Sequence, residues 1–376
     1  MSAHLRAVGA SDPQTGPIHI LHVADEVLFA HFGRMFGQLS LGLFEEGFRI
    51  SLVTDFAPVA PQFDATPVEC HCVVALSGWR AWRLGRELDA MFERPPRLVH
   101  VWGTKQLRRI SAWCSNHKIP LVVSVLSYAD IARVRRAIPP GRVRVAAACE
   151  RFAASLRSAD NRWLTNTFPL PPALLVTDDD AIDLAGPHSC GIVAVGPLHR
   201  DGGMLSLLDA AAALRADHLD FQMALLSDGG DASATYARIS QLKLHDCVSL
   251  IEDALLWDRA IAGADVMVVP NRLDYVTLAP LLAMALGRIV LAARGQPGDW
   301  FVEDGTCWSF VAGDAGELRS AMARAIARGP AALSLATSAA EYVARHFGIS
   351  QRASELAAIY HSTLGTGQRS TNHESD

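Results

Sequence analysis

The feature that most constrains the fold is a regular alternation of short apolar runs with longer stretches that carry apolar residues at helical spacing. Residues 18–24 form the first apolar run, and residues 31–46 then place their apolar side chains on one helical face. Gly47 ends that helix, and residues 48–54 form the next apolar run. Strands that alternate with helices in this way predict a mostly parallel sheet with helices on both faces.

The alternation runs along most of the chain and has one clear break. Prolines and an acidic triplet interrupt it between residues 168 and 190, which predicts a linker between two domains. A length of 376 residues also suits two domains better than one core. The predicted organisation is a flexible leader (1–17), an N-terminal Rossmann-like domain (18–170), the linker (171–190), a C-terminal Rossmann-like domain (191–345), a C-terminal helix (346–365) and a disordered tail (366–376).

Composition argues against several classes of protein. A hydrophobic content of 50% is typical of a globular chain, and a net charge of -5 argues against a nucleic-acid binder. The seven scattered cysteines favour reduced thiols in the cytoplasm over a disulfide framework. Cys70-His71-Cys72 has metal-ligating groups, but strand alternation explains it, and no second Cys/His cluster completes a site, so no metal is expected. The apolar runs are too short to span a bilayer.

Several enzyme signatures are missing from the sequence. A dinucleotide-binding enzyme needs Gly-x-Gly-x-x-Gly directly after its first strand, and the glycines near that point, Gly33 and Gly37, have the wrong spacing. The chain also lacks a Walker loop and a Gly-x-Ser-x-Gly turn. Hydride transfer, ATP hydrolysis and serine hydrolysis are therefore disfavoured, and no cofactor is expected.

Residues 264–293 are the most informative segment. A buried strand ends at Pro270, a polar loop follows, and a helix of small residues begins near Thr277. The start of that helix lies at the carboxyl edge of a parallel sheet, where ligands of open α/β folds bind. The peptide N–H groups of Thr277, Leu278 and Ala279 are therefore candidates for binding a phosphate. The alternative interpretation is a core helix with a threonine cap.

The same segment resembles glycosyltransferase family 4, a retaining family of GT-B fold. The likeness rests on residues 265–271 (Asp-Val-Met-Val-Val-Pro-Asn) and 281–287 (Leu-Leu-Ala-Met-Ala-Leu-Gly), and upstream on residues 195–198, 225–230 and 242–250. It implies two Rossmann-like domains with parallel sheets that face each other across a cleft, with C-terminal helices packing back. The C-terminal domain would bind a nucleotide-sugar donor, UDP- or GDP-linked, and the N-terminal domain an acceptor, without a metal.

The sequence departs from the family pattern at the donor site. At the two positions where the family pattern has acidic residues, this chain has Asp274 and Leu282. Where the pattern has an Arg and a Lys, it has Pro197 and Gly202. Leu282 has no polar atom with which to bind a ribose, although Asp274 can accept hydrogen bonds from sugar hydroxyls. Loss of two cations removes charge-assisted bonds that contribute roughly 1.5–3 kcal/mol each.

The resemblance and the residue types together give a set of candidate site residues. His199, Arg200 and Arg272 are candidate replacements for the missing cations, and His100 lies at the end of a strand, where it either lines the cleft or is packed in the core. The predicted catalytic residues are Asp274 and His100, the donor-binding residues are Gly196, His199, Arg200, Asp228, Gly229, Arg272, Thr277, Leu278 and Ala279, and the acceptor-side residues are Gly33, Trp102 and Gly103.

Two functions remain open at this point. One is a glycosyltransferase of hexosyltransferase type that transfers a sugar from a nucleotide-sugar donor to a glycan or lipid-linked acceptor, with retention implied by the family. The other is a catalytically inactive relative that acts as a partner or regulator in polysaccharide biosynthesis; a sugar epimerase is a weaker third. Residues 79–86 carry Trp and Arg, which fits either a peripheral contact with the inner membrane face or an ordinary solvated helix. The expected location is the cytoplasm.

Overall fold

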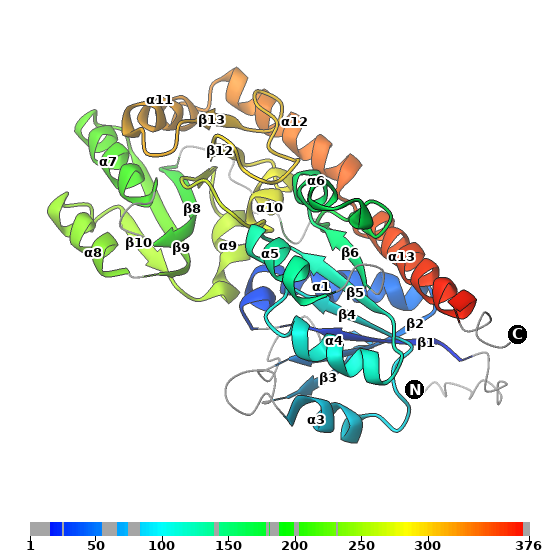
Figure 1. The fold of residues 1–376 in the computed structure, drawn as a ribbon. Helices are drawn as coiled ribbons and strands as arrows, with labels where there is room; N and C mark the ends of the chain where they lie inside the picture. The colour runs from blue at the N-terminus through cyan, green and yellow to red at the C-terminus, as the bar shows by residue number, and fades with distance from the viewer. Residues whose placement is uncertain are drawn as a thin grey trace, which may run out of the picture.

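The chain forms two parallel α/β domains that lie side by side (Figure 1). The computed structural model describes residues 16–24, 26–54, 66–73, 83–138, 143–177, 180, 188–198, 203–230 and 232–370, without the side chains of residues 26, 27, 29, 30, 162, 228, 229 and 366–370. The N-domain sheet has seven strands in the order β3-β2-β1-β4-β5-β6-β7, and the C-domain sheet has six in the order β10-β9-β8-β11-β12-β13. The predicted fold class is confirmed.

In the N-domain, each apolar run forms a strand and each periodic stretch a helix. The first helix, α1, begins at Glu26 rather than near residue 31, because Leu28 and Phe32 continue its apolar face at a spacing of four residues. The elements are β1 (Ile18–Val23), α1 (Glu26–Glu45), β2 (Phe48–Thr54), β3 (Glu69–Cys72), α3 (Leu84–Met91), β4 (Leu98–Trp102), α4 (Leu107–Asn116), β5 (Leu121–Val125), α5 (Tyr128–Ala137), β6 (Val143–Ala147), α6 (Glu150–Ala159), η3 (Asn161–Trp163) and β7 (Thr167–Pro169).

The C-domain repeats the pattern, and the chain then returns to the N-domain. Its elements are β8 (Cys190–Leu198), α7 (Gly203–Ala216), β9 (Phe221–Gly230), α8 (Ala232–Gln241), β10 (Val248–Ile251), η5 (Ala254–Leu256), α9 (Trp257–Ala262), β11 (Val266–Val269), α10 (Ala279–Ala285), β12 (Ile289–Ala293), β13 (Trp308–Phe310), α11 (Ala315–Ile326) and α12 (Pro330–His346). The final helix, α13 (Ile349–Ser370), packs against α1 (Figure 1). It extends past the predicted end at 365 into the predicted tail; residues 371–376 lie outside the described part.

The two places where the chain passes between the domains are bonded to each other. The Leu174 N–H donates to Phe347 O at 3.0 Å, and Leu174 forms a parallel bridge with Gly348. One apolar core runs from the N-domain into one face of the C-domain sheet and includes Val123, Met267 and Tyr360. A second core fills the other face of the C-domain sheet. Within the described residues, no helix is both long and apolar enough to cross a bilayer.

Candidate functional site

Both sheets have a switch point, where the strand order reverses, and the two switch points face one cavity. The switch lies between β1 and β4 in the N-domain and between β8 and β11 in the C-domain. Ligands of open α/β sheets bind at the carboxyl ends of the strands at such points. A cavity of about 330 Å³ is lined by the carboxyl end of β8 and by segments that follow β1, β4, β5 and β11, including parts of α1 and α5. It is the candidate site.

The N-domain wall of the cavity is polar. It is formed by His31, Gly103, Thr104, Lys105, Ser127, Asp130 and Arg133, together with the apolar Leu28, Phe32 and Leu126. Ser127 caps α5 by accepting the Asp130 N–H at 3.1 Å, and the Asp130 carboxylate accepts the N–H of Leu126, the residue before the cap, at 3.1 Å. The Thr104 hydroxyl donates to the same carboxylate. Asp130 thereby fixes the turn after β4 to the start of α5.

The C-domain wall consists of Pro197 and residues 274–276. Hydrogen bonds from two buried amide side chains on the side away from the cavity hold it in place. The Asn271 side chain accepts the Gly203 N–H at the start of α7 and donates to Pro197 O at 3.3 Å. Gln296 donates to Asn271 O at 2.6 Å and accepts the Leu273 N–H at 3.2 Å. Two buried amide side chains therefore hold the loop that carries Asp274.

Glycine is required at two positions in this brace. A Cβ at Gly203 would lie 1.8 Å from Pro270 O, so any side chain there must displace the backbone. Gly196 has φ +152, and a Cβ there would lie 3.2 Å from Asn271 Nδ2. Sequence reasoning selected Gly196 as a donor-site residue but missed Gly203. It also missed Asn271 and Gln296, because isolated amide side chains in loops carry no periodic signal.

Backbone hydrogen bonds join the two walls. The Tyr128 N–H donates to Asp274 O, and the Val276 N–H donates to Leu126 O, both at 2.9 Å. Ser127 and Tyr275 form an antiparallel bridge between them. The position of Asp274 is therefore set by the N-domain as well as by its own domain.

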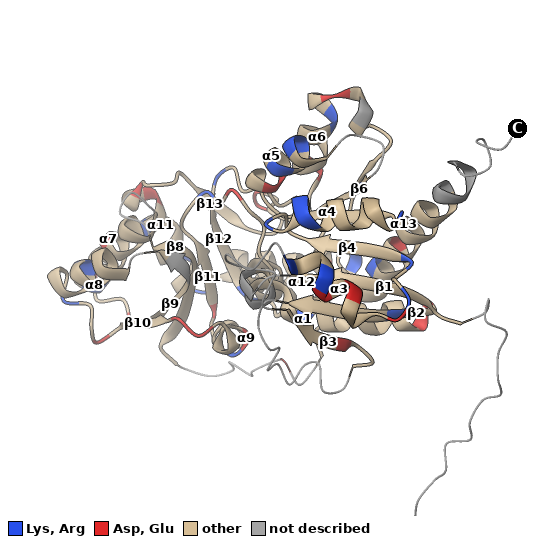
Figure 2. Ribbon diagram, turned by 60° about the horizontal axis from the view of Figure 1, so that its bottom comes forward, with Lys and Arg blue, Asp and Glu red and all other residues tan. Residues whose placement is uncertain are grey.

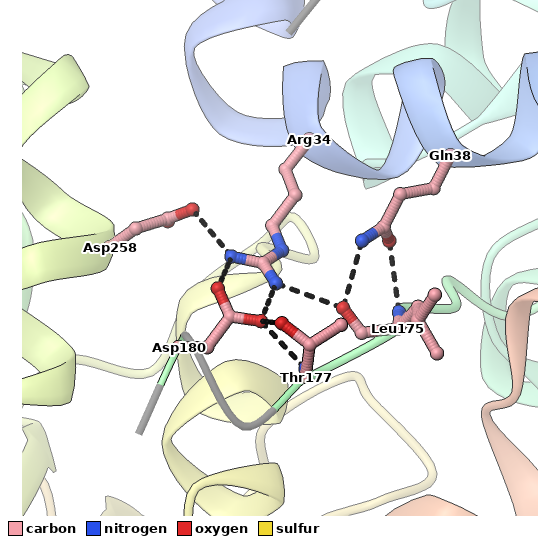
Figure 3. Close-up of polar contacts among 6 residues, drawn as sticks. All are labelled: Arg34, Gln38, Leu175, Thr177, Asp180 and Asp258. Atoms are coloured by element: carbon pink, nitrogen blue, oxygen red, sulfur yellow. Dashed lines mark hydrogen bonds and ion pairs between the residues drawn. The ribbon is translucent and has the colours of Figure 1, made fainter. Parts of the chain in front are cut away.

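Further polar contacts link the domains beside the cavity. Asp299 accepts the Glu150 N–H at the start of α6 at 2.7 Å, and Arg151 donates to Gly295 O at 2.9 Å. Figure 3 shows a second group, centred on Arg34 of α1. Its guanidinium donates to both oxygens of Asp180, at 2.8 and 2.6 Å, and lies 3.3 Å from an oxygen of Asp258 on α9.

The predicted donor-site residues are distributed as follows. Asp274 and Gly103 line the cavity, and Asp274 is exposed. Thr277, Leu278 and Ala279 are buried at the start of α10, directly after the cavity-lining Val276. Arg272 is exposed and lies beside Gly295, where an added Cβ would be 3.5 Å from the Arg272 Nε. His199, Arg200 and Gly202 lie outside the described residues; Asp228 and Gly229 are described only as backbone at the end of β9, and Gly33 is buried within α1.

His100 and Trp102 do not line the cavity, and this corrects the prediction for both. His100 is 0% exposed, and its ring nitrogens contact Tyr360 Oη at 2.6 Å and Ser124 Oγ at 2.8 Å. Trp102 Nε1 donates to His22 Nδ1 at 2.9 Å, and His22 Nε2 lies 3.1 Å from the same Tyr360 hydroxyl. This burial and these contacts fit the packed interpretation of His100 rather than a position in the cleft.

Burial keeps both histidines neutral. It lowers the pKa of His22 to about 3, and burial together with the neighbouring His22 lowers the pKa of His100 well below its ordinary value. Burial also raises the pKa of Tyr360 well above its ordinary value. These groups form an uncharged hydrogen-bond network beneath the N-domain wall.

The departures from the family pattern have clear structural consequences. Pro197 lines the cavity and offers no cation there, and Leu282 is 2% exposed within the apolar core. Across the described part of the chain, no group of three or more His, Cys, Asp or Glu residues could hold a metal ion. The described C-domain wall thus contributes one charged group to the cavity, the carboxylate of Asp274.

Comparison with known proteins finds a family model that matches the C-terminal half and solved structures of similar fold. Residues 189–328 match the family model described as "Glycosyl transferases group 1". No curated protein matches the sequence significantly. The structure is similar to sucrose-phosphate synthase from Thermosynechococcus elongatus, with a TM-score of 0.72 and 18% identity over 93% of this chain and 100% of that one.

Two further solved structures have the same arrangement of domains. Anabaena HepE in complex with UDP-glucose gives a TM-score of 0.71 at 14% identity, over 92% of this chain and 100% of that one. WaaG, a glycosyltransferase involved in lipopolysaccharide biosynthesis, gives 0.68 at 12% identity, over 91% and 99%. At these identities the likeness establishes the fold alone. The chain therefore has the GT-B fold, and residues 189–328 of its C-terminal half match the model of the group 1 glycosyltransferases.

Proposed function

We propose that the protein transfers a sugar from a nucleotide-sugar donor on the C-domain to a hydroxyl of a glycan or lipid-linked acceptor on the N-domain. The observation that carries this proposal is the cavity between the two switch points, with an exposed carboxylate on one wall and a polar wall opposite. Anabaena HepE, which shares the fold, binds UDP-glucose. In the reaction, the bond from the sugar C1 to the diphosphate oxygen breaks, a bond from C1 to the acceptor oxygen forms, and the acceptor proton passes to the departing diphosphate.

The chain's own residues have separate roles in this scheme. Asp274 accepts hydrogen bonds from the donor sugar and orients it. The peptide N–H groups of Thr277, Leu278 and Ala279 stabilise the charge that develops on the departing diphosphate. Thr277 is 3% exposed, and its hydroxyl has no hydrogen-bond partner among the described residues, which supports a polar ligand at this point. Retention of configuration follows from the family resemblance.

The proposal is tested by calorimetric titration of the protein with UDP, GDP and ADP and with their glucose conjugates. We expect saturable micromolar binding of one pair, and release of its nucleoside diphosphate when acceptor glycans are supplied. Asp274→Ala weakens binding of the sugar nucleotide by about tenfold, the loss expected for one hydrogen bond to a charged group. It leaves binding of the nucleoside diphosphate unchanged, because Asp274 contacts only the sugar.

Asp220→Ala is the matched control, because Asp220 is exposed and precedes β9 at the opposite, amino end of the sheet. Equal losses in both variants would contradict a specific role for Asp274.

The second candidate is a catalytically inactive binding protein. The buried Leu282 and the cavity-lining Pro197 favour it, because both replace donor-binding groups with apolar ones. Absence of binding to every nucleotide at millimolar concentration would support this candidate over the transferase.

A further inference from the structure

The described residues around the cavity carry an asymmetric distribution of charge. Two cations line it, Lys105 and Arg133, and both belong to the N-domain. Lys105 lies just before α4, and Arg133 lies on α5. Figure 2 shows further basic residues on both helices. Between residues 103 and 138 the basic residues are Lys105, Arg108, Arg109, Lys118, Arg133, Arg135 and Arg136, and the single acidic residue is Asp130.

The proposed function requires these cations to have a particular role. A nucleoside diphosphate that leaves into this cavity brings at least two negative charges, and Pro197 and Asp274 on the C-domain wall neutralise none of them. We propose that Lys105 and Arg133 bind the donor diphosphate from across the cleft and supply the positive charge that the described C-domain wall does not. This inference rests on the proposed function and assigns its leaving-group site.

Arg133 and the amides proposed to hold the same diphosphate lie on segments that are bonded to each other. Ser127, which caps α5, forms a bridge with Tyr275, two residues before Thr277. Arg133 lies on α5, in the second turn after that cap. The start of α5 and the loop that leads to Thr277 are therefore attached to each other directly.

Arg133 keeps donors available for a ligand. Its Nη1 lies 3.6 Å from Asp130 Oδ1 and 3.4 Å from Thr104 Oγ1, which are long contacts. Within the described chain, its Nε and Nη2 make no hydrogen bond, and the side chain is 49% exposed. The Asp130 carboxylate already accepts hydrogen bonds from Thr104 and the Leu126 N–H. It therefore positions Arg133 through Nη1 alone and leaves the Nε and Nη2 groups of Arg133 for a ligand.

This assignment has a consequence for how the donor binds. Phosphate-binding amides come from one domain and cations from the other, so tight binding of the diphosphate requires both domains to be in contact. Binding of the nucleoside part involves no such requirement. The contribution of Lys105 and Arg133 should therefore appear with ligands that carry phosphate and vanish with ligands that do not.

The experiment compares inorganic pyrophosphate, UDP and uridine by calorimetry on four full-length proteins: the wild type, Lys105→Gln, Arg133→Gln and Arg136→Gln. Arg136 is the matched control, because it is exposed on the same helix, makes no ion pair within the described residues and does not line the cavity. GDP with guanosine, and ADP with adenosine, replace the uridine pair if the titrations identify another base. A thermal melt of each variant verifies folding, and Arg133→Lys tests rescue by charge.

We expect Lys105→Gln and Arg133→Gln each to raise the Kd for UDP and pyrophosphate by tenfold or more, and Arg136→Gln to change it by less than twofold. Uridine affinity stays the same in all four proteins. Equal weakening by Arg136→Gln would overturn the proposal in favour of a diffuse positive field, and unchanged UDP affinity in Lys105→Gln and Arg133→Gln would overturn it while leaving the proposed function intact. Failure of wild-type protein to bind any nucleoside diphosphate would overturn both.

Discussion

The two walls of the cavity differ in what they contribute. The C-domain wall, which contains the family signature, is braced by buried amides and supplies one carboxylate and a set of backbone groups. The N-domain wall supplies a polar network and both described cations, although its sequence resembles the family only in general terms. The half of the chain with the clearer sequence signature thus contributes mainly backbone groups to the described cavity, and the other half contributes most of its charged side chains.

The largest expected difference between the halves is their response to acid. His22 and His100 are neutral in the folded N-domain, with pKa values depressed below 6.5 by burial, so the stability that they contribute is present above pH 6.5 and is lost as the pH falls. Below the unfolded pKa of 6.5, each histidine lowers the free energy of unfolding by ~1.4 kcal/mol per pH unit. We therefore expect the free energy of unfolding to fall by about 4 kcal/mol between pH 7 and pH 5.

Hydrogen exchange measured by mass spectrometry at pH 7 and pH 5 tests this prediction. β1, β4 and α13 should lose protection first, while β8 and β11 keep theirs. Earlier loss of protection in the C-domain strands would reverse the comparison.

The brace of the C-domain wall predicts an effect of similar size. Gly203→Ala places a methyl group against the carbonyl of Pro270, and since a backbone atom yields less than a side chain, we expect a loss of about 3 kcal/mol or more. Gly365→Ala is the control, because that helical glycine has nothing within 4 Å and alanine favours helix by ~1 kcal/mol.

Urea unfolding followed by circular dichroism measures both variants. A Gly203→Ala protein as stable as the wild type would show that the wall is not rigid.

The smallest expected effect concerns the contact between the halves. Arg34→Ala removes hydrogen bonds to Asp180 and Asp258 and leaves two carboxylates without their partner. Because the Arg34 side chain is 18% exposed and Asp258 is more open to solvent, we expect a loss of about 1–2 kcal/mol. Exchange should rise at residues 175–177 and in α9, with little change inside either sheet.

Arg345→Ala, which removes an exposed pair at 3.9 Å, should change stability by no more than about 0.5 kcal/mol. If the two variants behave alike, the Arg34 group does not hold the domains together.

The sequence predicted the architecture well because parallel strands buried on both faces are apolar runs, and runs such as residues 121–126 and 265–270 are typical of such strands. The buried hydrogen bonds around the site were harder to predict. His100 looked like a strand-end ligand because its hydrogen-bond partner, Tyr360, is 260 residues away along the chain. Asn271 and Gln296 gave no signal, since their bonds depend on how two loops meet. Lys105 and Arg133 were hidden among other basic residues, most of which face solvent.

The return of α13 to the first domain also imposes an order on synthesis. The N-domain leaves the ribosome before the C-domain, yet the hydroxyl that bonds His22 and His100 arrives only with Tyr360, after the whole C-domain has been made. Until then, the two imidazoles lack that hydroxyl, and the face of α1 that contacts α13 is without this helix. The N-domain can therefore complete its packing only after the whole C-domain has been synthesised.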